Sequence, residues 1–297
     1  AKSANGLSIS PLARRLITES GVSVDTVATY AAAKGLRRIG EKDVRAALAQ
    51  TGSPPGVAPA SSGMPLSAIR QKTAQRLAEN WRTIPHVFQT IEADFSNVDK
   101  VRLPIREAFK QANGFSLTYL PFIARAVCLA LKDFPNINAT FDGTALKPRR
   151  EVNLGIAIDL SHNGLVVPVV KQAGDLTAEG LAKAIARLTD KARGNKLTAD
   201  DLSGGTYSIT NNGAFGTLFT SPIINAPQVA ILSTDAIRKR PVVVSTAEGD
   251  FIAARTTGIL GQSFDHRAFD GAYSASFLSR LKQVIETHNW STEISGR

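Results

Sequence analysis

The sequence predicts an α+β fold in which helices flank a mixed β-sheet, with a small all-α module ahead of it. Three observations predict this organisation. Helical and strand-like periodicities are interspersed through the larger part of the chain, a Pro-, Gly-, Ser- and Ala-rich stretch interrupts it at 51–64, and only short helical patterns precede that stretch. With 297 residues, 43% of them hydrophobic and 20% charged, the chain can bury a sizeable core and form more than one folding unit.

The first module, 1–50, is predicted to contain two short helices. The first, Pro11–Ile17, follows Ser10, whose side chain can cap a helix N-terminus, and the second is Glu41–Leu48. A unit of this size is marginal by itself unless its few core residues pack well. Residues 51–64 are nearly free of large apolar side chains and are predicted to form a flexible, solvated linker.

The second module, 65–297, intersperses helical patterns with β-branched or alternating runs. Helical periodicity predicts helices over Ser67–Trp81, Val98–Ala112, Leu117–Leu131, Ala178–Arg193 and Ala268–His288. The runs that best predict strands are Asn153–Ile158, Leu165–Val170, Thr206–Thr210, Val229–Ser233, Val242–Ser245 and Thr257–Phe264. This arrangement, without an internal repeat, predicts a mixed sheet covered by helices.

Composition narrows the function classes. The formal net charge of +10 favours an acidic partner or a phosphate-bearing cofactor, and one short basic cluster is Arg238–Arg240. No aromatic residues interleave with the basic clusters, which disfavours nucleic-acid binding. No apolar run is long enough to indicate a membrane span, and no histidine spacing indicates a metal site. The single cysteine, Cys128, lies in the apolar run Phe122–Leu131, which predicts core packing and excludes a disulfide framework.

His266 is the histidine with catalytic potential. It follows a predicted strand and precedes a predicted helix within Phe264–Ala272, where a rigid scaffold can present a side chain to a cleft. On spacing alone, the preferred interpretation is a helix N-terminus at which Asp265 or Asp270 favours the helix dipole. His86 stands directly before a strand, and its position is equally compatible with a structural role and with lining a cleft.

A resemblance to a known family decides between these interpretations. Asp265–Gly271 resembles the His-x-x-x-Asp-Gly signature of the acyltransferase (E2) components of 2-oxo acid dehydrogenase complexes. That family shares its fold and active site with chloramphenicol acetyltransferase. Further segments resemble the family in the same order, and together they cover most of Met64–Ile294. These segments are Ile84–His86, Gly155–Asp159 with Gly164–Pro168, Thr210–Gly216 and Pro222–Leu232.

The resemblance implies a chloramphenicol-acetyltransferase-like fold and a homotrimer in which each active site lies between neighbouring subunits. It also implies transfer of an acyl group between the thiol of a dihydrolipoyl group and that of coenzyme A. His266 of one subunit is then the general base, Thr210 of the next subunit stabilises an oxyanion, and Asp270 supports the active-site loop by ion pairing. The residues implied for coenzyme A are Arg102, Thr118, Asp159 and Asn211, with backbone near Asp235 and Ile237.

The residue types suit this chemistry. A thiol with a pKa of about 8.5 is mostly protonated at neutral pH, so its attack on a thioester needs a base such as His266. The attack produces a negative oxygen, to which the Thr210 hydroxyl can donate. Without the resemblance, Thr210 is an ordinary strand threonine and Arg102 is a solvated helix cation.

Module 1–50 resembles the family's peripheral subunit-binding domain at Ser10–Leu16 and Glu41–Val44, but Thr26–Ile39 departs from the glycine-rich loop that family members carry. Its basic residues suit docking onto acidic patches of the dehydrogenase (E1) and dihydrolipoamide dehydrogenase (E3) components. The lipoyl group is implied to come from a lipoyl domain that is absent from this chain. The resemblance also implies a cytoplasmic or mitochondrial-matrix location.

Two alternatives stay open. A CoA-dependent acetyltransferase that acts on a free small molecule shares the catalytic motif, whereas a core subunit that only binds partners is expected to lack the base. The acyl group is open as well, because acetyl, branched-chain acyl and succinyl transferases share the quoted motifs; the pyruvate and branched-chain types are favoured. The sequence does not predict whether trimers assemble into a larger core.

Overall fold

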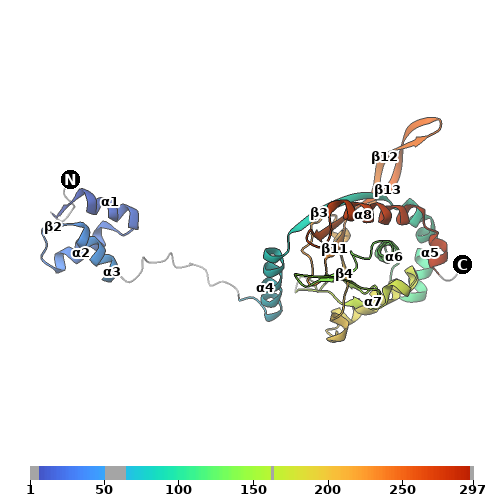
Figure 1. The fold of residues 1–297 in the computed structure, drawn as a ribbon, viewed down its shortest axis with the longest axis horizontal. Helices are drawn as coiled ribbons and strands as arrows, with labels where there is room; N and C mark the ends of the chain where they lie inside the picture. The colour runs from blue at the N-terminus through green and yellow to red at the C-terminus, as the bar shows by residue number, and fades with distance from the viewer. Residues whose placement is uncertain (1–6, 51–64, 162–163, 295–297) are drawn as a thin grey trace. The chain divides into compact units, whose positions relative to one another are not determined.

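A computed structural model describes residues 7–50, 65–161 and 164–294, and the chain divides into two units, Ala1–Pro65 and Leu66–Arg297 (Figure 1). The linker predicted at 51–64 lies outside the described residues. Within the described ranges, no helix is long and apolar enough to cross a lipid bilayer.

The N-terminal unit has one helix more than the sequence predicts. Its helices are α1 (Pro11–Ser20), α2 (Val24–Ala33) and α3 (Glu41–Gln50). The two-residue strands β1 (Ser8–Ile9) and β2 (Arg38–Ile39) pair in parallel. The prediction of only two helices was therefore wrong, and the unit is mainly but not wholly α-helical.

Local chemistry explains the additional helix α2. The Ser23 side chain accepts a hydrogen bond from the Thr26 N–H at 3.1 Å, which caps the helix, and four of its ten residues are alanine, the strongest helix former. Val27 and Ala31 are fully buried in a small core with Ile39. The helix thus supplies core residues that two helices alone could not provide.

The second unit is built on a mixed sheet, as predicted, and this sheet has seven strands. Its strands are β3 (His86–Asp94), β6 (Leu154–Ile156), β9 (Val169–Val170), β10 (Tyr207–Asn211), β11 (Ala230–Thr234), β12 (Arg238–Thr246) and β13 (Gly249–Asp265). They follow the order β12–β13–β11–β10–β6–β9, and β3 pairs with the second half of β13. β10 is parallel to β6 and β11, and the other pairings are antiparallel.

Two small strand pairs lie outside this sheet. One joins β4 (Ala139–Phe141) to β5 (Leu146–Pro148), and the other joins β7 (Ile158–Asp159) to β8 (Leu165–Val166). The first pair was not predicted. In the larger sheet, β12 and the first half of β13 form a hairpin that projects beyond the body of the unit (Figure 1).

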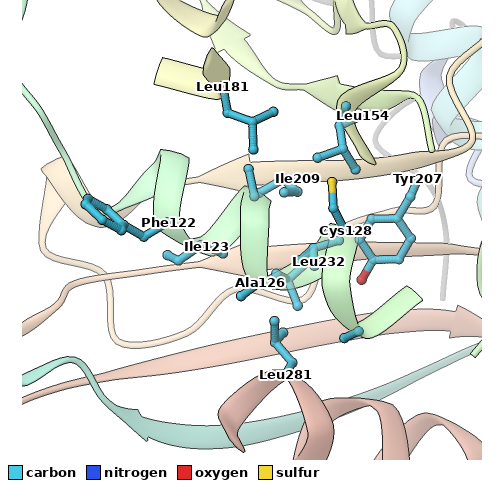
Figure 2. Close-up of a cluster of buried hydrophobic side chains, with 14 of the residues drawn as sticks. Phe122, Ile123, Ala126, Cys128, Leu154, Leu181, Tyr207, Ile209, Leu232 and Leu281 are labelled. Carbon is cyan, nitrogen blue, oxygen red and sulfur yellow. The ribbon is translucent and has the colours of Figure 1, made fainter. Parts of the chain in front are cut away.

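Helices and a buried apolar core complete the unit. The helices are α4 (Ala68–Thr83), α5 (Ser96–Asn113), α6 (Leu120–Leu131), α7 (Ala178–Arg193) and α8 (Gly271–Thr287), with 3₁₀ turns η1 (Ala173–Asp175), η2 (Asp200–Leu202), η3 (Gly213–Phe215) and η4 (Trp290–Glu293). α6 packs against α7 and α8, and α8 packs on β3. Figure 2 shows side chains of α6, including Ala126 and Cys128, in one buried cluster with the strand residues Ile209 and Leu232. The α+β prediction is confirmed.

Cys128 occupies the place predicted for it. Its side chain is fully buried in the core of the second unit, and this burial raises the pKa of the thiol to about 12. A thiol of that pKa carries almost no thiolate at neutral pH, so Cys128 is a packing residue rather than a nucleophile.

Candidate functional site

His266 lies immediately after the last residue of β13. Its backbone N–H donates to the carbonyl oxygen of Pro85 at 3.2 Å, and its ring centre lies 5.7 Å from that of Phe264. The side chain is exposed. The imidazole is therefore held by a strand end and is open to another molecule.

An ion pair braces the turn that carries His266. Asp265 is 2% exposed, and the Arg267 guanidinium donates to both of its carboxylate oxygens, Nε to Oδ1 at 2.9 Å and Nη2 to Oδ2 at 2.7 Å. The same guanidinium lies 4.9 Å from the centre of the Phe141 ring. The hydrogen bonds to Asp265 raise the pKa of Arg267. Both chain neighbours of His266 are thus fixed while its ring stays accessible.

Asp270 does not lie inside the following helix, where it was predicted. It is the N-cap residue of α8, its side chain is exposed, and it makes no capping hydrogen bond. α8 begins later than predicted because Asp265 accepts the N–H groups of Arg267 (3.0 Å) and Ala268 (2.9 Å), which keeps these residues in a turn. No described cation pairs with Asp270, so the ion pair predicted for it is not formed among the described residues. Asp265 and Arg267 form the ion pair of the turn.

A pocket of about 230 Å³ lies at the carboxyl ends of β10 and β11. It gathers four of the residues implied for coenzyme A: Thr118, Asn211, Asp235 and Ile237. The rest of its lining is Tyr119, Leu120, Ile123, Gly213, Ala214 and Thr234. The start of α6 and two strand ends therefore form one concave site of mixed polar and apolar character.

Asp235 is the buried acid of this pocket, with an exposed fraction of 1%. Its Oδ1 accepts hydrogen bonds from the hydroxyls of Thr217 (2.5 Å) and Thr220 (2.9 Å), which ties the loop after β10 to the sheet. Its Oδ2 is buried and lacks a hydrogen-bond partner among the residues that the structure describes. An unsatisfied buried acceptor costs about 1–3 kcal/mol, and more when it is charged, so leaving Oδ2 unpaired destabilises the chain.

Arg102 is buried against Asp99. The alternative interpretation of Arg102 as a solvated helix cation was therefore wrong. Its exposed fraction is 8%, and its Nε and Nη2 donate to Asp99 Oδ1 at 3.1 and 2.9 Å. Nη2 also donates to the Tyr119 hydroxyl at 2.9 Å, and the guanidinium lies 4.0 Å from the centre of that ring. Burial and the hydrogen bond to Asp99 raise the pKa of Tyr119. Arg102 therefore lies behind a pocket wall with its charge neutralised.

Asp159 is not part of this pocket. It is exposed at the end of β7, where it pairs with Leu165 of β8, and it is not a lining residue. Of the six residues implied for coenzyme A, four line one pocket, Arg102 lies behind its wall, and Asp159 lies outside it.

Thr210 and His266 lie at opposite ends of the sheet within one chain. Thr210 pairs with Ser233, and Ser233 pairs with Gly261, which precedes His266 by five residues. At about 3.3 Å per residue along a strand and about 4.8 Å between strands, the two Cα atoms are about 19 Å apart.

Thr210 and His266 also belong to different faces of the sheet. Ile209 is buried in the helix-covered core, so the half-buried Thr210 projects from the other face. The ring of His266, by contrast, lies beside Phe264, a residue of that same core. One chain therefore does not bring the two side chains together.

His86 has a structural role. Its Nε2 accepts the Ile224 N–H at 2.9 Å, which leaves Nδ1 as the protonated nitrogen that donates to the Ile84 carbonyl at 2.8 Å. Both ring nitrogens are thus used in holding the loop before β11 against the start of β3. Of the two roles compatible with its sequence position, the structural one is the role that these bonds support.

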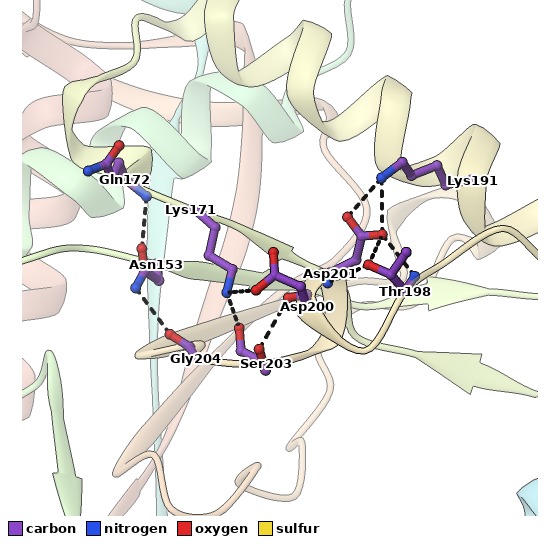
Figure 3. A network of polar contacts seen from close by, with 9 residues as sticks. All are labelled: Asn153, Lys171, Gln172, Lys191, Thr198, Asp200, Asp201, Ser203 and Gly204. Atoms are coloured by element: carbon purple, nitrogen blue, oxygen red, sulfur yellow. Dashed lines mark hydrogen bonds and ion pairs between the residues drawn. The ribbon is translucent and has the colours of Figure 1, made fainter.

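A larger pocket, of about 500 Å³, lies between α7 and β9 and contains none of the predicted site residues. Figure 3 shows the polar network beside it, in which the Lys171 Nζ donates to the Ser203 carbonyl at 2.7 Å and Lys191 pairs with Asp201 at 3.0 Å. The hydrogen bonds from Thr198 and Lys191 lower the pKa of Asp201 to about 2. These contacts hold the loop after α7 at the sheet edge, which is a structural function.

Three features of the site were not anticipated from the sequence: Tyr119 in the pocket wall, the neutralisation of Arg102, and the Asp265–Arg267 brace. The second had a local signal, because Asp99 precedes Arg102 by three residues on a predicted helix, a spacing at which opposite charges meet. Tyr119 is placed by contacts with Asp99 and Arg102, which lie 20 and 17 residues earlier. The Asp265–Arg267 pair is local, at a spacing of two residues, whereas the packing of Arg267 on Phe141 joins segments that are distant in the sequence.

Comparison with known proteins agrees with the sequence motifs. Residues 58–292 match the family described as 2-oxoacid dehydrogenases acyltransferase (catalytic domain). Over 240 residues the chain is 38% identical to the lipoamide acyltransferase component of the branched-chain alpha-keto acid dehydrogenase complex of Bacillus subtilis (strain 168). The aligned region is 81% of this chain and 56% of that protein. The chain spans about half the length of the curated relatives it matches.

Solved structures show the same fold. A probable dihydrolipoamide acetyltransferase from Listeria monocytogenes 4b F2365 superposes with a TM-score of 0.73 at 35% identity, over 78% of this chain and 98% of that one. The dihydrolipoamide acetyltransferase of Azotobacter vinelandii gives a TM-score of 0.72 at 32% identity, over 78% and 96%. Work on the latter concerns a serine, a histidine and an asparagine in its catalytic mechanism, with the asparagine four residues after the histidine.

Proposed function

Because this chain belongs to the family of 2-oxoacid dehydrogenase acyltransferases, we propose that it transfers an acyl group from a dihydrolipoyl thioester to coenzyme A. The observation that carries the proposal is the placement of His266. His266 belongs to the motif that the resemblance identifies, and its imidazole is exposed at the end of β13. The ion pair between its chain neighbours, Asp265 and Arg267, fixes the turn and leaves the ring nitrogens of His266 accessible. That arrangement suits a general base that must meet substrate from outside its own chain.

In the proposed step, His266 takes the proton from the thiol of coenzyme A as the sulfur attacks the thioester carbonyl carbon. A carbon–sulfur bond forms, the carbonyl electrons move to oxygen, and the Thr210 hydroxyl donates a hydrogen bond to that oxyanion. When the oxyanion collapses, the bond to the lipoyl sulfur breaks, and the His266 imidazolium returns the proton to that sulfur. One thioester replaces another, so the exchange needs no further reactant.

The proposed site combines residues of two subunits. The separation of about 19 Å between Thr210 and His266, estimated from strand geometry, supports a site that closes only when one copy's His266 meets another copy's Thr210. A ring of three copies, as the family resemblance implies, supplies three such sites. Asp270 stands four residues after His266, the spacing of the histidine and asparagine in the Azotobacter vinelandii enzyme, and we assign it a supporting role at the turn.

We assign the coenzyme A thiol arm to the pocket at the ends of β10 and β11. Asp235 Oδ2 is a buried acceptor without a donor among the described residues, and the amide and hydroxyl groups of a pantetheine arm are donors of the right kind. Thr118 and Asn211 supply further polar groups in the lining, while Leu120 and Ile123 supply apolar contact. Few polar groups in a partly apolar pocket are typical of a small-molecule site.

We propose that residues 1–50 form a peripheral subunit-binding domain, 51–64 a flexible linker and 65–297 the acyltransferase domain. Arg37 and Arg38 are exposed on the N-terminal unit, which supports docking onto acidic patches of the dehydrogenase and dihydrolipoamide dehydrogenase components. The helix α2 replaces the glycine-rich loop of the family, so the docking contacts differ in detail. The lipoyl group would be brought by a domain outside this sequence.

A transfer assay tests the proposal. The chain is mixed with dihydrolipoamide and acetyl-, isobutyryl- or succinyl-CoA, and with small alcohols and amines as competing acceptors. We expect acylation of dihydrolipoamide and not of the small acceptors, and the preferred donor identifies the acyl group. Acylation of free alcohols or amines alone would identify a small-molecule acetyltransferase instead, and no transfer to any acceptor would identify a non-catalytic core subunit.

A further inference from the structure

The basic cluster Arg238–Arg240 is not explained by the roles assigned so far. It follows Ile237, which lines the pocket assigned to coenzyme A, so it lies next to the pocket along the chain. The pocket lining itself contains Asp235 but no lysine or arginine. Arg102, which lies behind the wall, is already neutralised by Asp99. A ligand with several phosphate charges therefore needs a cation that these residues do not provide.

The register of the β12–β13 hairpin decides which side chain of the cluster faces the pocket. A Cβ added to Gly258 would meet the Ile237 side chain at 2.6 Å and the Phe95 ring at 3.3 Å, so Ile237 and Phe95 lie over that face of β13. Thr256, two residues before Gly258, points to the same face, and Thr256 is paired with Lys239. Lys239 thus shares its face of the sheet with Ile237.

That face leads to the pocket wall. The ring of Phe95 meets the ring of Tyr119 edge to face at 5.5 Å, and Tyr119 lines the pocket. Lys239 follows Ile237 by two residues, which is about 7 Å along an extended strand. The Lys239 side chain is exposed and forms no hydrogen bond or ion pair with the described residues.

The other two members of the cluster are less suited. Arg238 and Arg240 alternate with Lys239 along β12 and so project from the opposite face. Arg240 already lies 3.7 Å from the Glu92 carboxylate on that face. Only Lys239 of the three combines the pocket-side face with an ammonium group that is open to a ligand.

We propose that Lys239 binds a phosphate of coenzyme A at the mouth of the pocket, a role that rests on the proposed function. The ammonium group acts as a point charge on a flexible stem, so it can follow a phosphate that lies outside the enclosed part of the site. Arg102 then serves to position Tyr119 in the wall and does not itself contact phosphate.

Calorimetric titration of the full chain with coenzyme A tests the role of Lys239. We expect K239Q to weaken binding about tenfold at low salt, with a smaller difference at high salt. The matched control R238Q removes a neighbouring exposed charge on the opposite face and is expected to bind like the wild type. A second comparison, R106Q, removes an exposed cation one helical turn after Arg102 on α5.

Shortened ligands identify the phosphate. Dephospho-CoA lacks the 3′-phosphate and pantetheine lacks every phosphate. If K239Q weakens coenzyme A but not dephospho-CoA, the 3′-phosphate is the ligand; if it weakens both, the diphosphate is. Transfer to pantetheine is expected to be equal in the wild type and K239Q, which also shows that the variant is folded.

Equal affinity of K239Q and wild type for coenzyme A overturns the proposal. So does a loss of affinity that is equally large in R238Q, or a loss that is seen only in R106Q. A wild-type chain that does not bind coenzyme A at all contradicts the proposed function itself. The two failures are therefore distinguishable.

Discussion

The two ends of the second unit's sheet offer different things to a substrate. The His266 end presents an exposed imidazole on a turn that is held by the ion pair between the buried Asp265 and the exposed Arg267. The Thr210 end has a half-buried hydroxyl and a pocket of about 230 Å³, but no histidine lines that pocket. The His266 end lacks the hydroxyl and the pocket, and the Thr210 end lacks the imidazole. The comparison supports the proposal that one chain carries two halves of a site, and that the halves are completed between copies.

The largest expected effect is at the His266 end. Replacing the imidazole in H266A removes the proposed base, so we expect kcat to fall about 10²- to 10⁴-fold. The side chain is exposed and outside the core, so thermal unfolding should change little. Steady-state transfer from acetyl-CoA to dihydrolipoamide measures kcat, and a melting curve measures thermal unfolding. Unchanged kcat in a folded variant would remove His266 from the mechanism.

Thr210 offers the matching change at the other end. T210A removes the hydroxyl and is expected to lower kcat about 10²- to 10³-fold, the usual cost of losing one oxyanion donor. T210S keeps the hydroxyl and is expected to retain most of the activity. The outcome that contradicts the role is T210A and T210S with the same kcat, because a strand threonine that only packs would not distinguish them.

Two matched arginines, Arg267 and Arg280, test how much the Asp265–Arg267 ion pair stabilises the His266 end. Arg267 and Arg280 have side chains of equal exposure, 40%, but the partner of Arg267 is 3% exposed and that of Arg280 is 52% exposed. R267M leaves Asp265 buried without a cation and is expected to cost about 1–3 kcal/mol of unfolding free energy. R280M is expected to cost about 0–1 kcal/mol, as exposed pairs do. Urea titration compares them, and equal losses would refute the brace.

The smallest expected effect concerns Asp235 in the pocket. D235N keeps an oxygen acceptor for Thr217 and Thr220 but turns the unpartnered Oδ2 into a donor. If a ligand donates to Oδ2, the KM for coenzyme A rises about twofold to tenfold with kcat nearly constant. A variant that is more stable than the wild type and binds coenzyme A equally well would show that Oδ2 has no ligand.

Local patterns predicted the fold where a segment's own sequence suffices. The bounds of α7, Ala178–Arg193, were predicted because its apolar residues keep helical spacing. In the structure Thr177 caps this helix by accepting the Gly180 N–H. The strand β13 was predicted only from Thr257, although it begins at Gly249. Its first half is a strand because β12 supplies its backbone partners, and a pairing between segments is not visible in either one alone.

The resemblance named residues for the site, but no pattern predicted how the fold arranges them. The motif resemblance named Thr118, Asn211, Asp235 and Ile237, which the fold gathers in one pocket. Periodicity could not place Thr210 and His266 at opposite ends of a sheet, because that depends on strand order and register. The helix α2 was not predicted either, although Ser23 caps it and four of its residues are alanine.

Subunit mixing tests the shared site most directly. H266A and T210A chains with different affinity tags are co-expressed, and oligomers that carry both tags are isolated. In a closed trimer each mixed oligomer contains one interface with an intact His266 facing an intact Thr210, so we expect about a third of the wild-type activity from two nearly inactive parents. Activity no higher than that of either parent alone would contradict the account, because it would mean that both groups act within one chain.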